Sequence, residues 1–146
     1  MTTRLEVDSA TVRFGPRVAL ADVALAAAPG EVVAVLGPSG SGKSTLLRAV
    51  AGLQRLDAGR VCIDGRDQVD VPVHRRGVGL MFQDHALFPH RDVGGNVSFG
   101  LRMQGRPAGE ITTRVAELLE LVGLPGAQRR PVAELSGGEQ QRVALA

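Results

Sequence analysis

The amino-acid sequence predicts an α/β fold with a partial parallel sheet, and three consecutive features carry this prediction. An unbroken apolar run at residues 32–36 has the composition of a strand covered on both faces of a parallel sheet. A glycine-rich stretch over residues 37–45 follows this strand directly. A helical pattern then begins at about Ser44 and ends at Gly52. A strand, a glycine-rich loop and a helix in this order are typical of proteins that bind phosphate groups.

The N-terminal part of the chain predicts a β-hairpin. Residues 5–14 form the first strand pattern, Gly15 and Pro16 a turn, and residues 18–28 a second apolar strand. Phe14 lies just before the turn, where its ring can stack on a purine base or pack in the core. The spacing alone favours neither of these two interpretations.

The glycine-rich stretch fits the phosphate-binding pattern G-x-x-x-x-G-K-[ST] at every fixed position. A phosphate chain must be wrapped by backbone N–H groups, and only glycine and small side chains allow that close approach. We expect Lys43 to reach the β- and γ-phosphates and Ser44 to bind Mg²⁺. Thr45 is expected in the helix, near the phosphates. The residues of the predicted site are Gly37, Pro38, Ser39, Gly40, Ser41, Gly42, Lys43, Ser44 and Thr45.

Two other interpretations of this stretch are weaker. An ordinary glycine turn does not account for the agreement between the loop pattern and its flanking strand and helix. The dinucleotide pattern G-x-G-x-x-G is excluded, because the glycines stand at positions 37, 40 and 42. Lys43 is moreover the one lysine among 17 lysine and arginine residues, at a position where a compact ammonium differs in function from a guanidinium. The stretch therefore favours a nucleoside triphosphate as its ligand.

A second apolar strand pattern, at residues 78–82, ends at Gln83. The carboxyl ends of parallel strands meet at one edge of a sheet, so we expect Gln83 at the edge that carries the phosphate loop. Its amide can bind Mg²⁺ or orient a water molecule, and an ordinary surface amide is the alternative. Upstream, residues 60–63 predict a short strand that is followed by a tight turn at Asp64 and Gly65.

The second half of the chain predicts mainly helices. Residues 84–109 are loop-rich and partly helical, and their apolar side chains on irregular backbone make a candidate docking surface. Residues 110–122 carry apolar side chains at helical spacing, and Gly123 ends this helix. The core-facing side chains of this helix are expected to be Ile111, Val115, Leu118, Leu119 and Val122.

A last motif near the C-terminus predicts another helix. Ser136 and Glu139 form the S-x-x-E capping box, so the helix begins at about Gly137. Gly137 and Gly138 expose its first N–H groups, which offers a second anion-binding helix end. An ordinary well-capped helix is the alternative, and capping alone favours that alternative.

Composition limits the possible functions. The 146 residues with 44% hydrophobic content suit one domain core. The net charge of +2 comes with only 3% aromatic residues and no Trp or Tyr, which argues against a nucleic-acid partner. The single cysteine, Cys62, excludes an internal disulfide and suits the cytoplasm. No apolar run approaches the ~20 residues of a membrane span, so membrane association is expected only through a partner.

Taken together, these motifs resemble the ATP-binding subunit of an ABC transporter, over essentially the whole chain. Residues 37–44 are similar to its Walker A loop, Gln83 to its Q-loop glutamine, and residues 135–140 to its LSGGQ signature in the variant LSGGE. Phe14 is similar to the aromatic position that stacks on adenine, where the family usually has a tyrosine. The resemblance implies a P-loop NTPase fold of the ABC type, with a β-hairpin subdomain, a core sheet and a helical subdomain.

The resemblance also implies the chemistry of the site. ATP and Mg²⁺ are the expected ligands, with Lys43 and Gln83 as catalytic residues and with Ser44 and Gln83 at the metal. In the family, the signature helix of one subunit closes over the γ-phosphate bound by a second subunit in a head-to-tail dimer. This makes the second helix end a binding site rather than only a capped helix. The residues expected to act in trans are Ser136, Gly137, Gly138 and Glu139.

Residues 82–90 resemble importers for polyamines, ferric iron, sulfate, molybdate or thiamine. In those systems the residues after the glutamine form the groove for the transmembrane permease subunits, and an extracytoplasmic solute-binding protein takes part indirectly. The expected location is cytoplasmic, on the inner face of the membrane through the permease. The expected division is a β-subdomain and nucleotide-binding core at residues 1–83, a helical subdomain at 84–135, and the signature motif with its helix start at 135–146.

The sequence departs from the family pattern at its end. The family continues into an apolar strand that ends in Asp-Glu, which holds Mg²⁺ through water and supplies the general base, and later into a switch histidine. This chain contains no Asp-Glu pair, so we expect a truncated cassette with an exposed sheet edge and no hydrolysis by the chain as written. A non-hydrolysing remnant that binds nucleotide or a partner is the alternative. An ABC protein of translation or DNA repair is weaker, because tandem cassettes and long coiled-coil insertions are absent.

Overall fold

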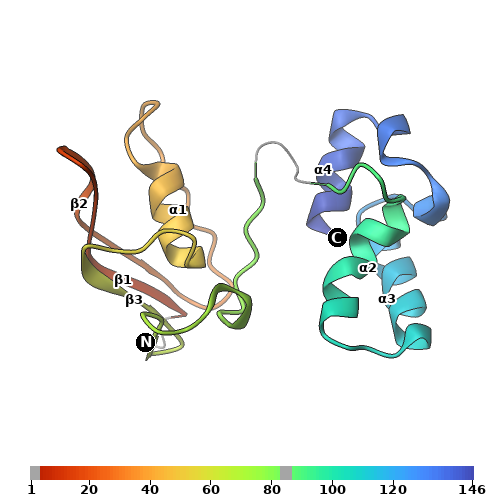
Figure 1. Cartoon of the computed structure of the whole chain (residues 1–146), viewed down its shortest axis with the longest axis horizontal. Helices are drawn as coiled ribbons and strands as arrows, with labels where there is room; N and C mark the ends of the chain where they lie inside the picture. Colours follow the sequence, from red (N-terminus) through yellow and green to blue (C-terminus); the bar gives the residue numbers. More distant parts are fainter. Residues whose placement is uncertain (1–3, 83–86) are drawn as a thin grey trace. The chain divides into compact units, whose positions relative to one another are not determined.

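The computed structural model describes residues 4–82 and 87–146 of the chain. The chain divides into two compact units, Met1–Leu80 and Met81–Ala146 (Figure 1). Each unit has its own hydrophobic core, so the single core expected from length and composition is replaced by two. The units are described here one after the other.

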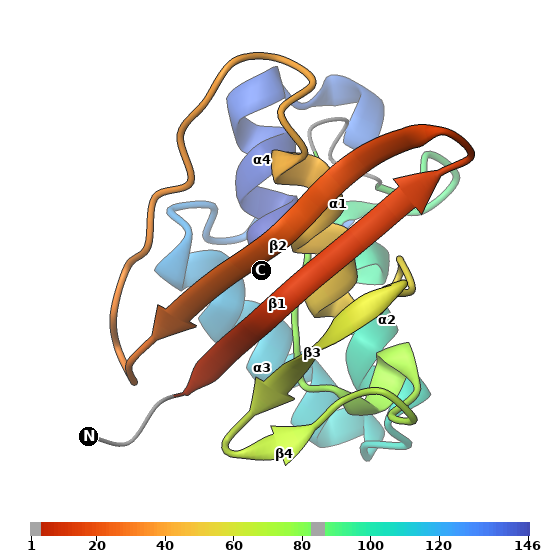
Figure 2. The same cartoon turned by 90° about the vertical axis from the view of Figure 1, so that its left-hand side faces the viewer.

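The first unit is an antiparallel sheet with one helix packed on it (Figure 2). Strands β1 (Leu5–Phe14) and β2 (Arg17–Ala27) form the predicted hairpin. Strand β3 (Ala58–Ile63) pairs with the other edge of β1, and the short β4 (Arg66–Asp67) follows it, which gives the order β2-β1-β3-β4. The predicted turn after β3 is confirmed: both of its central residues have positive φ, the geometry that aspartate followed by glycine favours.

Helix α1 (Lys43–Ala51) packs its apolar face against this sheet and ends, as predicted, at Gly52. Gly52 has a φ of 83°, and its N–H donates to the backbone oxygen of Ala49 at 3.0 Å. The buried side chains of this first core are Val7, Ala10, Val12, Leu20, Leu46, Val50 and Val61. The position of α1 matters for function because the glycine-rich loop leads into its N-terminus.

Arg76 holds the other end of α1. Its guanidinium donates to the backbone oxygens of Ala49 and Val50, both at 3.4 Å, and to that of Gln68 at 2.7 Å. A Cβ on Gly52 would lie 2.5 Å from Arg76 Nε, so a larger residue there would displace this side chain. Arg76 thereby ties the C-terminal end of α1 to the segment that follows the sheet. Cationic side chains commonly bind the free carbonyl groups at helix C-termini in this way.

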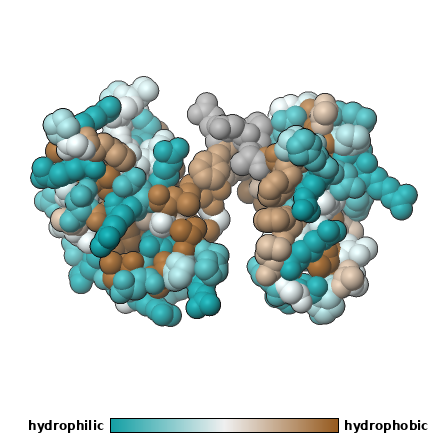
Figure 3. All heavy atoms as spheres, viewed as in Figure 1, coloured by the Kyte–Doolittle hydropathy of each residue, from teal (hydrophilic) through white to brown (hydrophobic). Residues whose placement is uncertain are grey.

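The predicted strands at residues 32–36 and 78–82 are not formed, and these two predictions are wrong. Within the described parts of the chain, the backbone of both segments lacks a neighbouring strand, and the sheet there is antiparallel. Val32 is 94% exposed and Leu36 89%, although Val35 packs against the first core. An apolar run shows that a segment can be buried, but a strand also needs a neighbour for its N–H and C=O groups. Hydrophobic residues accordingly appear on the visible surface (Figure 3).

The second unit is helical. It contains α2 (Val93–Met103), α3 (Ala108–Leu121) and α4 (Gly137–Leu145), with single 3₁₀ turns at Ala127–Arg129 and Val132–Glu134. The α/β class with a hairpin sheet and a helical part is confirmed. The buried side chains of the second core are Val93, Val97, Val115, Leu119, Leu124, Ala127, Leu135 and Val143. In the described part of the chain, no helix has the length and apolar character to cross a membrane.

Helices α3 and α2 differ in how far the sequence predicts them. The helix predicted at residues 110–122 is confirmed as α3, with Val115 and Leu119 buried. The sequence does not delimit α2, because three glycines within it lower its helix propensity. What starts α2 is Asp92, whose carboxylate accepts a hydrogen bond from the N–H of Gly95 at 2.6 Å.

Leucines 119 and 121 on α3 test the second core. Leu119 is completely buried, whereas Leu121 is 80% exposed on the same helix. Leu119→Ala is expected to lower the free energy of unfolding by about 2–5 kcal/mol, because it leaves a cavity. The matched control Leu121→Ala is expected to change it by less than about 0.5 kcal/mol. Urea unfolding followed by far-UV circular dichroism measures both values, and equal losses would contradict this core.

Candidate functional site

The glycine-rich loop leads directly into the N-terminus of α1. Gly40 and Gly42 have φ angles of 79° and 92°, in the left-handed region where other residues are strained. A Cβ on Gly42 would also lie 2.3 Å from the backbone oxygen of Ala19 on β2. The loop therefore lies against the hairpin in a way that only glycine permits. The first N–H groups of α1 have no partner inside the helix and are available to an anion.

The loop and the end of the hairpin enclose an open hollow of about 620 Å³. This volume lies within the ordinary range of small-molecule sites. The structure thus brings Phe14 together with Ser39, Gly40 and residues 42–45 of the predicted site, whereas Gly37, Pro38 and Ser41 do not line the hollow. The residues that line the hollow are Phe14, Arg17, Ala19, Ser39, Gly40, Gly42, Lys43, Ser44 and Thr45.

Phe14 and Arg17 reach the hollow from the two strands of the hairpin. Phe14 is 51% exposed and lines the hollow, so the alternative that it packs in the core is wrong. An exposed ring of this kind can stack on a flat base, and the adenine contact stays a prediction. Arg17 Nη2 donates to the backbone oxygen of Gly40 at 3.4 Å. This contact ties the hairpin to the loop.

Lys43 folds back over the loop that precedes it. Its Nζ donates to the backbone oxygens of Gly37 at 2.8 Å and Pro38 at 2.6 Å, and it lies 3.4 Å from Ser41 Oγ. These three acceptors are all neutral. A phosphate would offer charged acceptors instead, and hydrogen bonds between charged partners are shorter and stronger. The ammonium group is therefore already held at the loop. A bound anion there would replace its neutral acceptors with charged ones.

Ser44 is exposed in the hollow next to Lys43, so its hydroxyl suits a metal bound to phosphates. Among the residues that the structure describes, no group of three or more His, Cys, Asp or Glu is placed to hold a metal ion. An Mg²⁺ ion at Ser44 would therefore take most of its ligands from phosphate oxygens and water, as this ion does in nucleotide sites. Gln83, the second predicted metal residue, lies outside the described residues.

The predicted capping box at the start of α4 is confirmed. Ser136 Oγ accepts from the N–H of Glu139 at 3.3 Å, and Glu139 Oε2 accepts from the N–H and the hydroxyl of Ser136 at 2.8 and 2.9 Å. Arg130 Nη1 donates to the other carboxylate oxygen, Oε1, at 2.9 Å. The hydrogen bond from the backbone of Ser136, followed by the one from Arg130, lowers the pKa of Glu139 to about 2.

Gly137 and Gly138 open α4 although nothing within the described chain requires glycine there. Neither residue has a positive φ. A Cβ on Gly137 would meet no atom within 4 Å, and one on Gly138 would meet only Arg142 Nη1, at 3.7 Å. Within a helix, glycine is less favourable than alanine by roughly 1 kcal/mol. This pattern is expected where a group from outside the described chain closely approaches a helix end.

Two arginines of this geometry are not recognisable from the sequence. Arg17 binds the loop from the hairpin, and Arg130 binds Glu139 from the turn that precedes the signature motif. Neither belongs to a motif, and arginine is too frequent in this chain for one of them to stand out. Their positions flanking motif residues are the one signal that the sequence offers.

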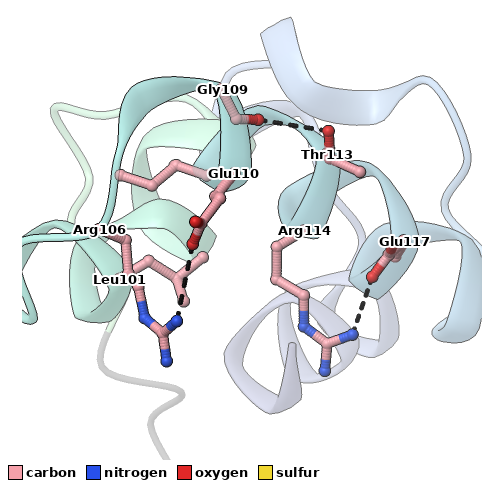
Figure 4. A pocket seen from close by; sticks show the side chains of 8 residues that line it. Leu101, Arg106, Gly109, Glu110, Thr113, Arg114 and Glu117 are labelled. Carbon is pink, nitrogen blue, oxygen red and sulfur yellow. Dashed lines mark hydrogen bonds and ion pairs between the residues drawn. The ribbon is translucent and has the colours of Figure 1, made fainter.

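A second hollow, of about 480 Å³, lies along α3 and does not form a candidate site (Figure 4). Its charged side chains point toward one another in pairs: Arg106 with Glu110 at 3.6 Å, and Arg114 with Glu117 at 2.9 Å. All four side chains are more than half exposed, and such surface pairs contribute little to stability. No predicted site residue lies among them.

Comparison with known proteins finds one family model, individual relatives and a solved structure that resemble the chain. The family model described as ABC transporter matches residues 20–146. The chain is 72% identical to the Fe(3+) ions import ATP-binding protein FbpC of Streptomyces coelicolor, over 97% of this chain and 41% of that protein. It is 51% identical to the sulfate/thiosulfate import ATP-binding protein CysA of Mycobacterium tuberculosis, over 100% of this chain and 42% of that protein. The chain thus spans about two fifths of the length of these curated relatives.

A solved structure also resembles the chain, with a TM-score of 0.83 and 31% sequence identity over 97% of this chain and 67% of that chain. It is the ATP-binding cassette MJ0796, in a dimeric post-hydrolysis state bound to ADP and Pi.

The capping box makes a testable contribution to stability in acid. The pKa of the Glu139 carboxyl falls from 4.5 to about 2 on folding, so its ionised form stabilises the fold above pH 4.5. That stabilisation is lost as the pH falls toward the folded pKa. We expect the wild type to melt above Glu139→Gln at neutral pH, and the difference in Tm to shrink between pH 4.5 and about 2. Thermal unfolding across this range measures it, and a pH-independent difference would contradict the network.

Proposed function

Because the chain belongs to the ABC transporter family, we propose that it is the N-terminal part of the ATP-binding subunit of an import system. In this proposal, ATP binding and hydrolysis drive a solute across the membrane. The observation that carries the proposal is the hollow that unites Phe14 with the loop around Lys43. The names of the relatives at 72% and 51% identity, which are import ATP-binding proteins, support import as the direction.

The proposed binding mode follows from the lining of the hollow. The ring of Phe14 stacks on adenine, while the N–H groups of residues 37–45 and the ammonium of Lys43 surround the phosphates. Ser44 and Gln83 hold Mg²⁺, which neutralises charge on the β- and γ-phosphates. Lys43 and Gln83 are the proposed catalytic residues within this chain. Thr45, at the start of α1, lines the same hollow as Ser44.

The second helix end completes the site in the proposed head-to-tail dimer. Residues 136–139 of one subunit approach the γ-phosphate that the other subunit holds at its loop. The glycines at the start of α4 support this role, since no neighbour in the described chain requires them. The dimeric state of the MJ0796 cassette with ADP and Pi is a further support.

Hydrolysis needs a group that this sequence does not contain. No Asp-Glu pair occurs in the 146 residues, so the pair implied by the family resemblance has to come from a longer protein. We therefore propose turnover for a protein with the full length of the relatives, and nucleotide binding without turnover for the 146 residues alone. The second state is the alternative function, a non-hydrolysing nucleotide- or partner-binding remnant.

The proposed partners also come from the family resemblance. Transmembrane permease subunits bind the helical part at residues 84–135. The nucleotide-binding part at 1–83 and the signature motif at 135–146 serve the nucleotide. An extracytoplasmic solute-binding protein acts indirectly, and no nucleic acid is involved. The protein would then lie in the cytoplasm, on the inner face of the membrane. The names of the relatives give Fe(3+) and sulfate/thiosulfate as the ions that those proteins help to import. The proposed solute of this protein is likewise an inorganic ion.

Lysine 43 provides the direct test of nucleotide binding. MgATP is expected to raise the Tm of the wild-type chain, since a ligand at 100 times its Kd stabilises by about 2.7 kcal/mol. Lys43→Ala is expected to lose this shift, because the phosphates lose their cation. The control Arg48→Ala, on the exposed side of α1 and outside the hollow, is expected to keep it. Differential scanning fluorimetry with increasing MgATP measures the three shifts.

Two outcomes of this titration would contradict the proposal. A wild-type chain whose Tm does not respond to MgATP does not bind the nucleotide. An equal response of the wild type and Lys43→Ala places the nucleotide somewhere other than the loop.

A further inference from the structure

The start of α4 contains an electrostatic conflict. Glu139 lies in the first turn of this helix, and the proposed function brings a γ-phosphate to the same helix end. A carboxylate beside a phosphate repels it, and the repulsion is strong where water is excluded. A signature helix with glutamate at this position therefore needs something that cancels the charge.

The side chain of Arg130 meets this need. Its Nη1 donates to Glu139 Oε1 at 2.9 Å, and its Nη2 lies 3.4 Å from the backbone oxygen of Glu134. The two charged side chains are 41% and 22% exposed, so they are partly shielded from water. This pair is less exposed than every other ion pair in the described residues.

The backbone of Arg130 is fixed as well. Its oxygen accepts from the N–H of Val93 at the start of α2, at 3.0 Å, and its own N–H donates to the oxygen of Ala127, at 3.0 Å. Val93 and Ala127 are both buried in the second core. The arginine is therefore held at both ends, by the core through its backbone and by α4 through its guanidinium.

The contacts of Glu139 also set the state of the Ser136 hydroxyl. One carboxylate oxygen is satisfied by Arg130 and the other by the N–H of Ser136 at 2.8 Å. The hydroxyl of Ser136 adds a third contact at 2.9 Å, but it carries a single proton and can rotate. With the carboxylate already satisfied by two other donors, this proton is free to turn toward a phosphate oxygen.

We propose that Arg130 is a positioning residue of the nucleotide site: it cancels the charge of Glu139 and holds its carboxylate on Ser136, so that the helix end accepts an ATP γ-phosphate in trans. The inference rests on the proposed function, since it assumes that the γ-phosphate approaches this helix end. Arg130 itself does not touch the nucleotide. It acts through Glu139 and Ser136.

The test uses a protein with the full length of the relatives and measures MgATP-dependent self-association by analytical ultracentrifugation. Arg130→Ala is expected to lower the affinity of this association about fivefold or more for each nucleotide site, because the charge of Glu139 is then uncompensated. Adding Glu139→Gln to Arg130→Ala is expected to restore it, because glutamine keeps a carbonyl oxygen for the N–H of Ser136 without the charge. The defect of Arg130→Ala is also expected to shrink as salt is raised, because salt screens the repulsion.

The control variant is Arg114→Ala, which breaks an arginine–glutamate pair at the same distance of 2.9 Å within α3 (Figure 4). It is expected to leave the association unchanged. The KM for ATP is expected to rise in Arg130→Ala more than kcat falls, since binding in trans is what weakens.

The outcomes separate this inference from the proposed function. A wild-type protein that does not associate with MgATP contradicts the head-to-tail site itself. A wild type that associates, together with an Arg130→Ala variant that matches it, contradicts the role of Arg130. An Arg130→Ala defect that Glu139→Gln does not relieve and salt does not alter means that Arg130 only holds the fold, which also contradicts the inference.

Discussion

Unpaired backbone N–H groups at the N-termini of α1 and α4 determine which residues can surround these two helix ends. Each helix end uses glycine, but for different reasons. Gly42 before α1 has a φ of 92° and no room for a Cβ, so the fold itself requires it. Gly137 at the start of α4 has open space around it. The first helix end is shaped by its own unit, whereas the second is open within the part of the chain that the structure describes.

Each helix end also has one cation that neighbouring oxygens hold in place. Lys43 is held by the backbone oxygens of Gly37 and Pro38, and Arg130 is held by the carboxylate of Glu139. The lysine meets neutral acceptors and can exchange them for a phosphate, whereas the arginine is occupied by a full negative charge. In the proposed site, the first cation binds the nucleotide, and the second removes a charge that would repel it.

Periodicity and turn chemistry anticipate the local elements, because these depend on nearby residues: the hairpin, the turn at Asp64 and Gly65, and α1, α3 and α4 all form where the sequence predicts them. Residues 32–36 fail as a strand because a strand depends on a neighbour, which composition does not report. For the candidate site, the loop motif anticipates the lining of the hollow. Arg17 and Arg130 stay hidden because they act on residues in other elements.

In the proposed dimer, the helix ends of two different subunits meet on one nucleotide. Mixing two inactive variants of a protein with the full length of the relatives tests this arrangement: Lys43→Ala, which keeps its signature helix, and Gly137→Glu, which keeps its loop. Gly137→Glu is expected to fold, since a Cβ there meets no atom within 4 Å. Each variant alone is expected to lack MgATP hydrolysis, and the mixture is expected to recover part of it, because the mixed dimer has one intact site. A mixture as inactive as its components would contradict a site built in trans.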